Sequence, residues 1–118
     1  MNKRKKGACN EKTAGTFLEM KGCQILAYNY RCRYAEIDLI AMERNTLVFC
    51  EVKYRGYNDM EQALQSVTRR KQRRICAAAK FYLAEHLEYT DLNCRFDVIG
   101  ITDDEIRWIK NAFDYMGG

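Results

Sequence analysis

The stretch EIDLIAMERNTLVFCEVKYR, residues 36–55, constrains the fold more than any other part of the chain. Apolar and polar residues alternate along both of its halves, which is the period of a β-strand. The polar, turn-compatible residues Glu43, Arg44 and Asn45 separate the two halves. The sequence therefore predicts a β-hairpin with its turn centred between Arg44 and Asn45.

Pairing across that turn places Asp38 opposite Glu51 and Glu36 opposite Lys53, with all four side chains on the same side of the sheet. A slip of one residue would mix charged and apolar residues on both sides, so the apolar pattern supports this register. The opposite side is expected to be buried and collects Ile37, Leu39, Ala41, Val48, Cys50 and Val52.

Carboxylates that face each other across a sheet repel, so Asp38 and Glu51 require compensation. Either a shared proton or a divalent cation would supply it. Mg²⁺ prefers carboxylates together with water and phosphate oxygens, so these two residues and the carbonyl of Val52 form a candidate metal site. Lys53 would then orient an attacking water or stabilise charge on a phosphate. The alternative is an ordinary polar side of a hairpin that faces solvent.

Two helices and three further strands are expected around the hairpin. One helix is predicted over residues 8–21, with Glu11 at the end of an apolar stripe. Glu11 either approaches the carboxylate side as a third ligand or sits in the first turn, where it favours the helix dipole. A second helix is predicted over residues 66–86, capped by Ser66 or Thr68 and preceded by a lesser helical stretch. Strands are predicted at residues 23–32, 95–102 and 105–110, the last at an edge of the sheet.

Composition fits one globular domain, residues 1–118, with 47% hydrophobic residues. Residues 1–7 are expected to form a flexible basic tail. No apolar run approaches the ~20 residues that span a bilayer, and no apolar signal core follows the basic start, so we expect a cytoplasmic protein without a membrane partner. The six cysteines lack zinc-finger spacing and the single histidine is His86, so we expect reduced thiols in or near the core and no zinc.

A dense basic cluster, RRKQRR, starts the second predicted helix in a chain of net charge +4. Lys71 shares a helical face with Ile75 and Tyr82 and should lean toward the sheet, whereas the arginines should point outward. Such a helix start could hold backbone phosphates without reading a base sequence. The alternative is a solvated charged face. The candidate nucleic-acid-binding residues are Arg69, Arg70, Lys71, Arg73, Arg74 and Arg55.

The order of these features resembles a known superfamily. An aspartate, a dozen residues and then Glu-Val-Lys on the next strand, preceded by a helical glutamate, are similar to the PD-(D/E)XK, or restriction-endonuclease-like, nucleases. More closely, the blocks EIDLIA, LVFCEVKYR, RRKQRRICAAAKFYL, RFDVIGI and IKNAF resemble the YraN family of small bacterial proteins over roughly residues 7–113. Ala35 and Tyr54 stand where that family usually has Gly and often Thr, and neither change removes a proposed ligand.

The resemblance implies a restriction-endonuclease-like α/β fold, with a central mixed five-stranded sheet flanked by helices in the order α-β-β-β-α-β-β. It implies that Asp38 and Glu51 are metal ligands assisted by Glu11, that Lys53 is the catalytic lysine, and that Glu36 is the family's glutamate in the same strand. The implied cofactor is Mg²⁺ or Mn²⁺.

Among nucleases of this fold, archaeal-type Holliday junction resolvases are the relatives suggested first, which implies branched DNA as substrate and a homodimer. A fold does not by itself establish an activity. Two other functions therefore remain open at this point. One is a nucleic-acid-binding module that does not cut, and the other is an interaction subunit whose partner supplies the activity. The sequence does not distinguish DNA from RNA.

Overall fold

A five-stranded sheet forms the centre of the computed structural model, which describes residues 3–33, 35–56 and 59–115. The strands are β1 (Gln24–Arg31), β2 (Glu36–Glu43), β3 (Thr46–Tyr54), β4 (Asn93–Ile101) and β5 (Ile106–Phe113), and they lie side by side in that order. Only β3 and β4 run parallel, while the other neighbouring pairs are antiparallel. The sheet is therefore mixed, as predicted.

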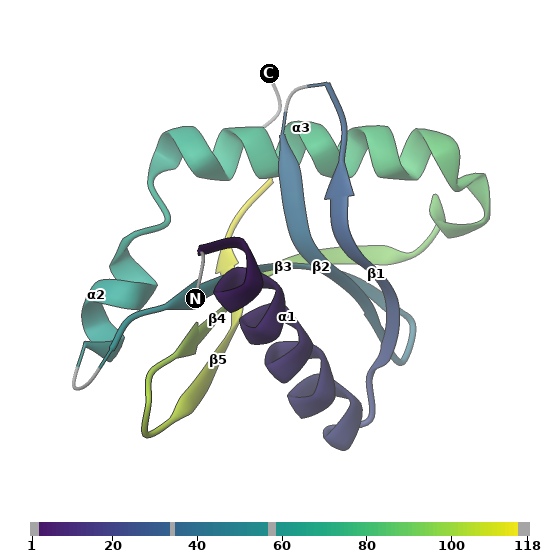
Figure 1. Cartoon of the computed structure of the whole chain (residues 1–118). Coiled ribbons are helices and arrows are strands. Elements are labelled where there is room, and N and C mark those ends of the chain that lie inside the picture. Colours follow the sequence, from purple (N-terminus) through teal and green to yellow (C-terminus); the bar gives the residue numbers. More distant parts are fainter. Residues whose placement is uncertain (1–2, 34, 57–58, 116–118) are drawn as a thin grey trace.

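The parallel pair requires a crossover, which α2 (Met60–Gln65), α3 (Arg69–Glu85) and the short 3₁₀ helix η1 (Leu87–Tyr89) provide. With α1 (Lys3–Met20) at the start, the element order confirms the predicted α/β arrangement. Figure 1 shows α1, in purple, in front of the strands and α3, in green, crossing at the top of the view. The two long helices cover separate apolar clusters on the sheet.

Helix α1 begins at Lys3 rather than at residue 8, so most of the stretch expected as a tail is helical. Lysine and arginine are good helix formers, which explains the extension. Gly15 lies where the helix meets β1, and a Cβ there would stand 2.0 Å from the Tyr28 hydroxyl oxygen. The helix can approach the sheet this closely only because position 15 has no side chain.

The hairpin has the predicted register. Leu39 pairs with Cys50 and Ile40 with Phe49, and the turn contains Arg44 at a φ of 54°. The expected pairings of Asp38 with Glu51 and of Glu36 with Lys53 are not formed among the described residues, because the ladder between β2 and β3 stops at Leu39 and Cys50. Beyond that point β2 continues along β1, and β3 continues along β4. The two central strands therefore separate at the end that carries the charged residues.

Both faces of the hairpin are covered. Leu39 and Cys50 share one buried side, as predicted, and α1 covers that side. Ile37 joins the cluster on the α3 side instead, which corrects its predicted placement. Ile40 and Phe49, which share the charged side of the strands, are fully buried beneath α3. The interpretation of that side as an ordinary solvated hairpin face is therefore wrong along the middle of the strands.

The described cysteine side chains differ in burial. Cys23, Cys50 and Cys76 are buried, as expected, whereas Cys32 is half-buried and Cys94 is exposed. The side chain of Cys9 lies outside the part of the chain that the structure describes. Among the described residues, no helix combines the length and the apolar character needed to cross a bilayer.

Candidate functional site

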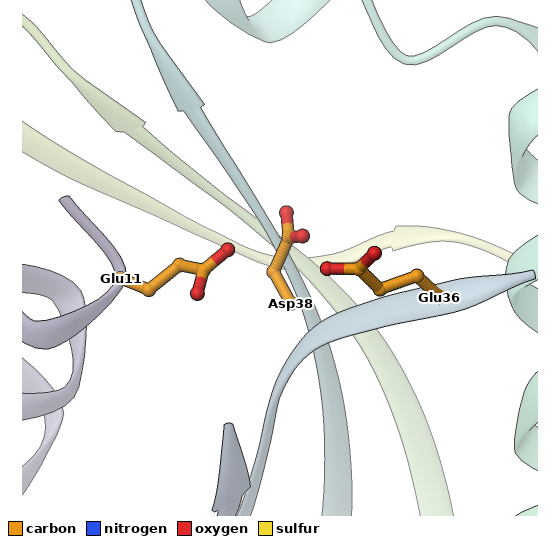
Figure 2. Close-up of side chains that lie close together, drawn as sticks. All are labelled: Glu11, Glu36 and Asp38. Carbon is orange, nitrogen blue, oxygen red and sulfur yellow. The ribbon is translucent and has the colours of Figure 1, made fainter. Parts of the chain in front are cut away.

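Three carboxylates meet where β2 separates from β3. Glu11 comes from α1, Glu36 and Asp38 come from β2, and one oxygen of each lies within 4.8 Å of the others. Figure 2 shows Asp38 between the two glutamates, with the three carboxylates directed toward one another. Because α1 begins at Lys3, its first turn contains no acidic residue, so the helix-dipole explanation of Glu11 is wrong.

Backbone contacts hold Asp38 in this position. Its Oδ2 accepts a hydrogen bond of 2.9 Å from the backbone N–H of Val52. That N–H becomes available to a side chain because β2 and β3 no longer pair regularly here. The strand separation thus positions Asp38 between the acidic cluster and β3.

Glu51 lies next to Asp38 and is only 3% exposed. Burial, followed by the hydrogen bond and charge of Asp38, raises the pKa of Glu51 to about 9, against the opposing effect of Lys71 and Lys53. Burial and then the charge of Asp38 raise the pKa of Glu11 to about 7. The Oε2 of Glu11 is buried and has no hydrogen-bond partner among the described residues. These carboxylates are therefore packed together with too little positive charge around them.

Two lysines border the carboxylates. The ammonium Nζ of Lys71, from α3, lies 3.3 Å from Oε1 of Glu51. Lys53, on β3, is half-buried and lies beside Lys71. Burial, followed by the nearby Lys71 ammonium, lowers the pKa of Lys53. Burial alone would also lower the pKa of Lys71, but Lys53 and the neighbouring carboxylates raise it. Lys71 therefore retains its proton, while Lys53 releases its proton more readily than an ordinary lysine.

The start of α3 brings its basic residues to the same place. Thr68 caps the helix by accepting a hydrogen bond of 3.2 Å from the backbone N–H of Lys71, which confirms one of the two predicted caps. A pocket of about 540 Å³ lies between the helix start and the strand ends. Its lining residues are Ala35, Glu36, Asp38, Glu51, Thr68, Arg70, Lys71, Arg74 and Ile75. Carboxylates from the sheet thus face cations from the helix.

The predicted nucleic-acid-binding residues fall into three groups. Arg70 and Arg74 are exposed and line the pocket. Arg69 and Arg73 are exposed on the same helix but do not belong to its lining. Lys71 leans toward the sheet, as its helical face predicted.

Arg55 lies apart from the helix, just after β3, where it is half-buried. Its guanidinium donates a hydrogen bond of 2.9 Å to the carbonyl of Tyr54. The backbone N–H of Arg55 bonds to the carbonyl of Ile101 at 3.0 Å. These contacts fix Arg55 to the end of the sheet, and its predicted contact with nucleic acid stays a prediction.

Two residues on β1 belong to the site although no sequence motif indicated them. Asn29 adopts a φ of 53° within the strand, and its side chain lies beside Glu11, where it opposes the rise in the pKa of that carboxyl. Arg31 lies with its Nε 3.2 Å from Oε2 of Glu36, so the described ionic partner of Glu36 is Arg31 rather than Lys53. Asparagine tolerates positive φ better than most residues, but that property has meaning only once the strand pairing is known.

The donor atoms suit a hard divalent cation. Carboxylate oxygens are preferred by Mg²⁺ and Mn²⁺, and the unpartnered Oε2 of Glu11 offers a ligand atom that is already removed from water. The predicted metal ligands were Asp38, Glu51, Val52 and Glu11. The group of described carboxylates whose oxygens lie within 4.8 Å of one another contains Glu36 in place of Glu51, and Lys71 contacts Glu51 instead.

Known proteins are similar to this sequence over most of its length. The model of the uncharacterised protein family UPF0102 matches residues 10–101. A UPF0102 protein of Lachnoclostridium phytofermentans is 47% identical over 117 residues, which cover 99% of each chain. One from Francisella tularensis is 44% identical over 87% of this chain and 89% of its own. One from Coxiella burnetii is 43% identical over 88% of each chain. In agreement with the resemblance to YraN proteins, the chain belongs to the UPF0102 family.

Proposed function

We propose that this protein is a metal-dependent nuclease of the PD-(D/E)XK superfamily that hydrolyses phosphodiester bonds in DNA. The observation that carries the proposal is the under-compensated group of Glu11, Asp38 and Glu51, which shares one site with Lys53 and faces the cations of α3. A protein that only binds nucleic acid gains nothing from buried carboxylates directed at phosphate, because the like charges repel.

Each residue has a role in this proposal. Asp38, Glu51 and Glu11, with the carbonyl of Val52 and assistance from Glu36, would hold Mg²⁺ or Mn²⁺. When bound, the cation would neutralise charge on the phosphate and lower the pKa of a bound water. Lys53 accepts a proton from the attacking water or holds that water in line, as its lowered pKa favours. Arg70 and Arg74 hold neighbouring phosphates at the mouth of the pocket.

The substrate class and assembly in this proposal come from the resemblance to junction resolvases. Branched DNA offers two symmetric strands, and two symmetric incisions require two copies of a single-site enzyme. The proposal therefore includes a homodimer acting on four-way junctions. A cytoplasmic location would bring the protein into contact with such DNA.

The proposal is tested by incubating labelled DNA with purified protein and Mg²⁺ or Mn²⁺. The panel contains a four-way junction, a flap, a linear duplex and a single strand, with a matching RNA hairpin. Asp38→Asn protein, purified identically, serves as the control because it keeps the shape of the side chain and removes its charge. Cleavage by the wild type that disappears in Asp38→Asn supports the proposal and ranks the substrates.

Equal cleavage by both proteins would indicate a contaminating nuclease. Binding without cleavage by either protein, under all metal conditions, would contradict the proposal and favour the binding module. Cleavage of the RNA hairpin alone would support metal-dependent phosphodiester hydrolysis and would show that the substrate is RNA rather than DNA.

A further inference from the structure

Lys71 contacts the most deeply buried carboxylate of the site from the opposite wall of the pocket. We propose that Lys71 is an internal counter-ion which holds Glu51 when no divalent cation is bound, and which transfers to a substrate phosphate when a cation takes Glu51. This inference rests on the proposed metal site. It implies that the affinity of the site for nucleic acid depends on whether a divalent cation is bound.

The geometry indicates which partner of the ion pair moves. Glu51 is 3% exposed and lies within β3, where its backbone is paired with β4. The Lys71 side chain is 39% exposed and reaches the carboxylate from the first turns of α3. Lysine carries a compact charge on a flexible four-carbon stem, so the ammonium can leave without moving the backbone.

Electrostatic repulsion would displace the Lys71 ammonium from Glu51 when a divalent cation binds. Lys71 is the only cation within salt-bridge distance of Glu51 in the described part of the chain. A divalent cation bound to the same carboxylate would lie a few ångströms from the ammonium, and the two positive charges would repel each other. The carboxylate therefore favours one cation over the other, and the ammonium is displaced.

The pocket offers the displaced ammonium a natural destination. Arg70 and Arg74 line the same wall, one residue before and three residues after Lys71. Residues three apart are neighbours on a helix surface, so a phosphate bound between the arginines lies within reach of the lysine. Metal binding would thus add one cation to the phosphate grip. Because linkage is reciprocal, bound nucleic acid would also strengthen metal binding.

The test measures equilibrium binding of a fluorescein-labelled four-way DNA junction by anisotropy, without any cleavage. Each protein is titrated in EDTA and in Ca²⁺, which binds carboxylates and is used here as the probe of metal occupancy. Lys71→Met is compared with Arg73→Met, which removes an exposed cation of the same helix from outside the pocket lining. We expect Lys71→Met to weaken binding about tenfold in Ca²⁺ and less than about threefold in EDTA. Arg73→Met should weaken binding by the same factor in both conditions.

A second variant keeps the test decisive even if Lys71→Met folds poorly. Glu51→Gln frees Lys71 without removing it, so this variant should tighten junction binding in EDTA. Asp38→Asn removes one nearby negative charge but leaves the pair between Lys71 and Glu51. Its increase in junction affinity in EDTA should therefore be several-fold smaller than that of Glu51→Gln. In the double variant Lys71→Met with Glu51→Gln, the substitution of Glu51 should no longer tighten junction binding in EDTA, because the lysine that it would free is absent.

The outcomes separate this inference from the proposed function. An equal effect of Lys71→Met in Ca²⁺ and in EDTA, or no junction binding at all, overturns the inference even if cleavage sensitive to Asp38→Asn has been established. A metal-dependent effect of Lys71→Met in a protein that never cleaves DNA supports the inference and overturns only the nuclease.

Discussion

Glu51 on β3 and Asp97 on β4 are buried carboxylates on neighbouring strands, but their surroundings are opposite. Asp97 is fully buried and accepts two hydrogen bonds from Arg95, one from the indole of Trp108 and one from the backbone of Asn111, at 2.7–3.0 Å. Glu51 has one cation, Lys71, at 3.3 Å and a second carboxylate beside it. A buried charge with a full set of donors is tolerated inside a fold, whereas one with too few favours the uptake of a proton or of another cation.

The pKa values of the surrounding glutamates show the same contrast. Glu43 belongs to the Asp97 group through Arg95. Burial alone would raise the pKa of Glu43, but hydrogen bonds from Lys110 and Arg95 lower it. Near Glu51 the balance is reversed, and burial raises the pKa of both Glu11 and Glu51. Acid should therefore weaken the contacts of Glu43 with Lys110 and Arg95 and relieve the repulsion around Glu51. The difference separates a charge-compensated network from an under-compensated one.

The largest effect on stability should follow from removing Asp97, the buried carboxylate with a full set of donors. Asp97→Ala leaves the half-buried Arg95 with only one of its two carboxylate partners, Glu43, and removes the acceptor of Trp108. We expect the free energy of unfolding to fall by about 3–5 kcal/mol, as when one partner of a buried ion pair is removed. Urea denaturation followed by circular dichroism measures the loss. The control Asp91→Ala, at an exposed position, should change the free energy of unfolding by less than about 0.5 kcal/mol. A similarly small effect of Asp97→Ala would show that the network around Asp97 does not contribute to stability.

The next effect concerns the under-compensated side. A divalent cation that binds only the folded protein should raise the free energy of unfolding by about 2.7 kcal/mol at a hundred times its dissociation constant. Thermal unfolding of the wild type in EDTA and in increasing Mg²⁺ or Mn²⁺ measures the shift. Asp38→Asn removes a proposed ligand and should abolish most of the gain. If this variant is stabilised as much as the wild type, the cation binds elsewhere.

A smaller gain in stability is expected from a substitution at Glu51 itself. The raised pKa means that ionising Glu51 costs more in the folded protein than in the unfolded chain, so this group lowers stability as the pH rises from about 4.5 toward 9. Glu51→Gln removes that cost and should stabilise the protein in EDTA at pH 8 by about 1–2 kcal/mol. The advantage should shrink steadily toward pH 5. A Gln variant that is less stable at pH 8, or whose advantage does not vary with pH, would mean that Lys71 compensates Glu51 fully.

The smallest effect tests the outer wall of the pocket. The logarithm of DNA affinity falls with the logarithm of salt concentration by about 0.9 for each phosphate contacted in a duplex. Replacing Arg70 and Arg74 by Ala should flatten this slope by up to about 1.8, as measured by anisotropy at several salt concentrations. Lys80→Ala removes an exposed charge from the same helix outside this pocket and should leave the slope nearly unchanged. An unchanged slope in the arginine variant would show that the basic helix start does not hold the DNA.

Several features of the site were predictable because they depend on local periodicity. The alternation along β2 and β3 specified the hairpin register, since a slip of one residue would have placed charges against the core. The period of the helix specified that Lys71 leans inward with Ile75 and Tyr82. The element order followed from the same patterns and gave the α/β arrangement with its five strands.

The sequence by itself thus determined the elements, the pairing of the hairpin and the inner face of the basic helix, because each depends on residues a few positions apart. Only the tertiary structure decided that β2 and β3 separate beyond Leu39, that Glu11 reaches Asp38, and that Lys71 rests on Glu51. These contacts depend on how closely a helix docks, as the approach of α1 over Gly15 illustrates. Docking is set by packing between segments far apart in the chain, and no local pattern encodes it.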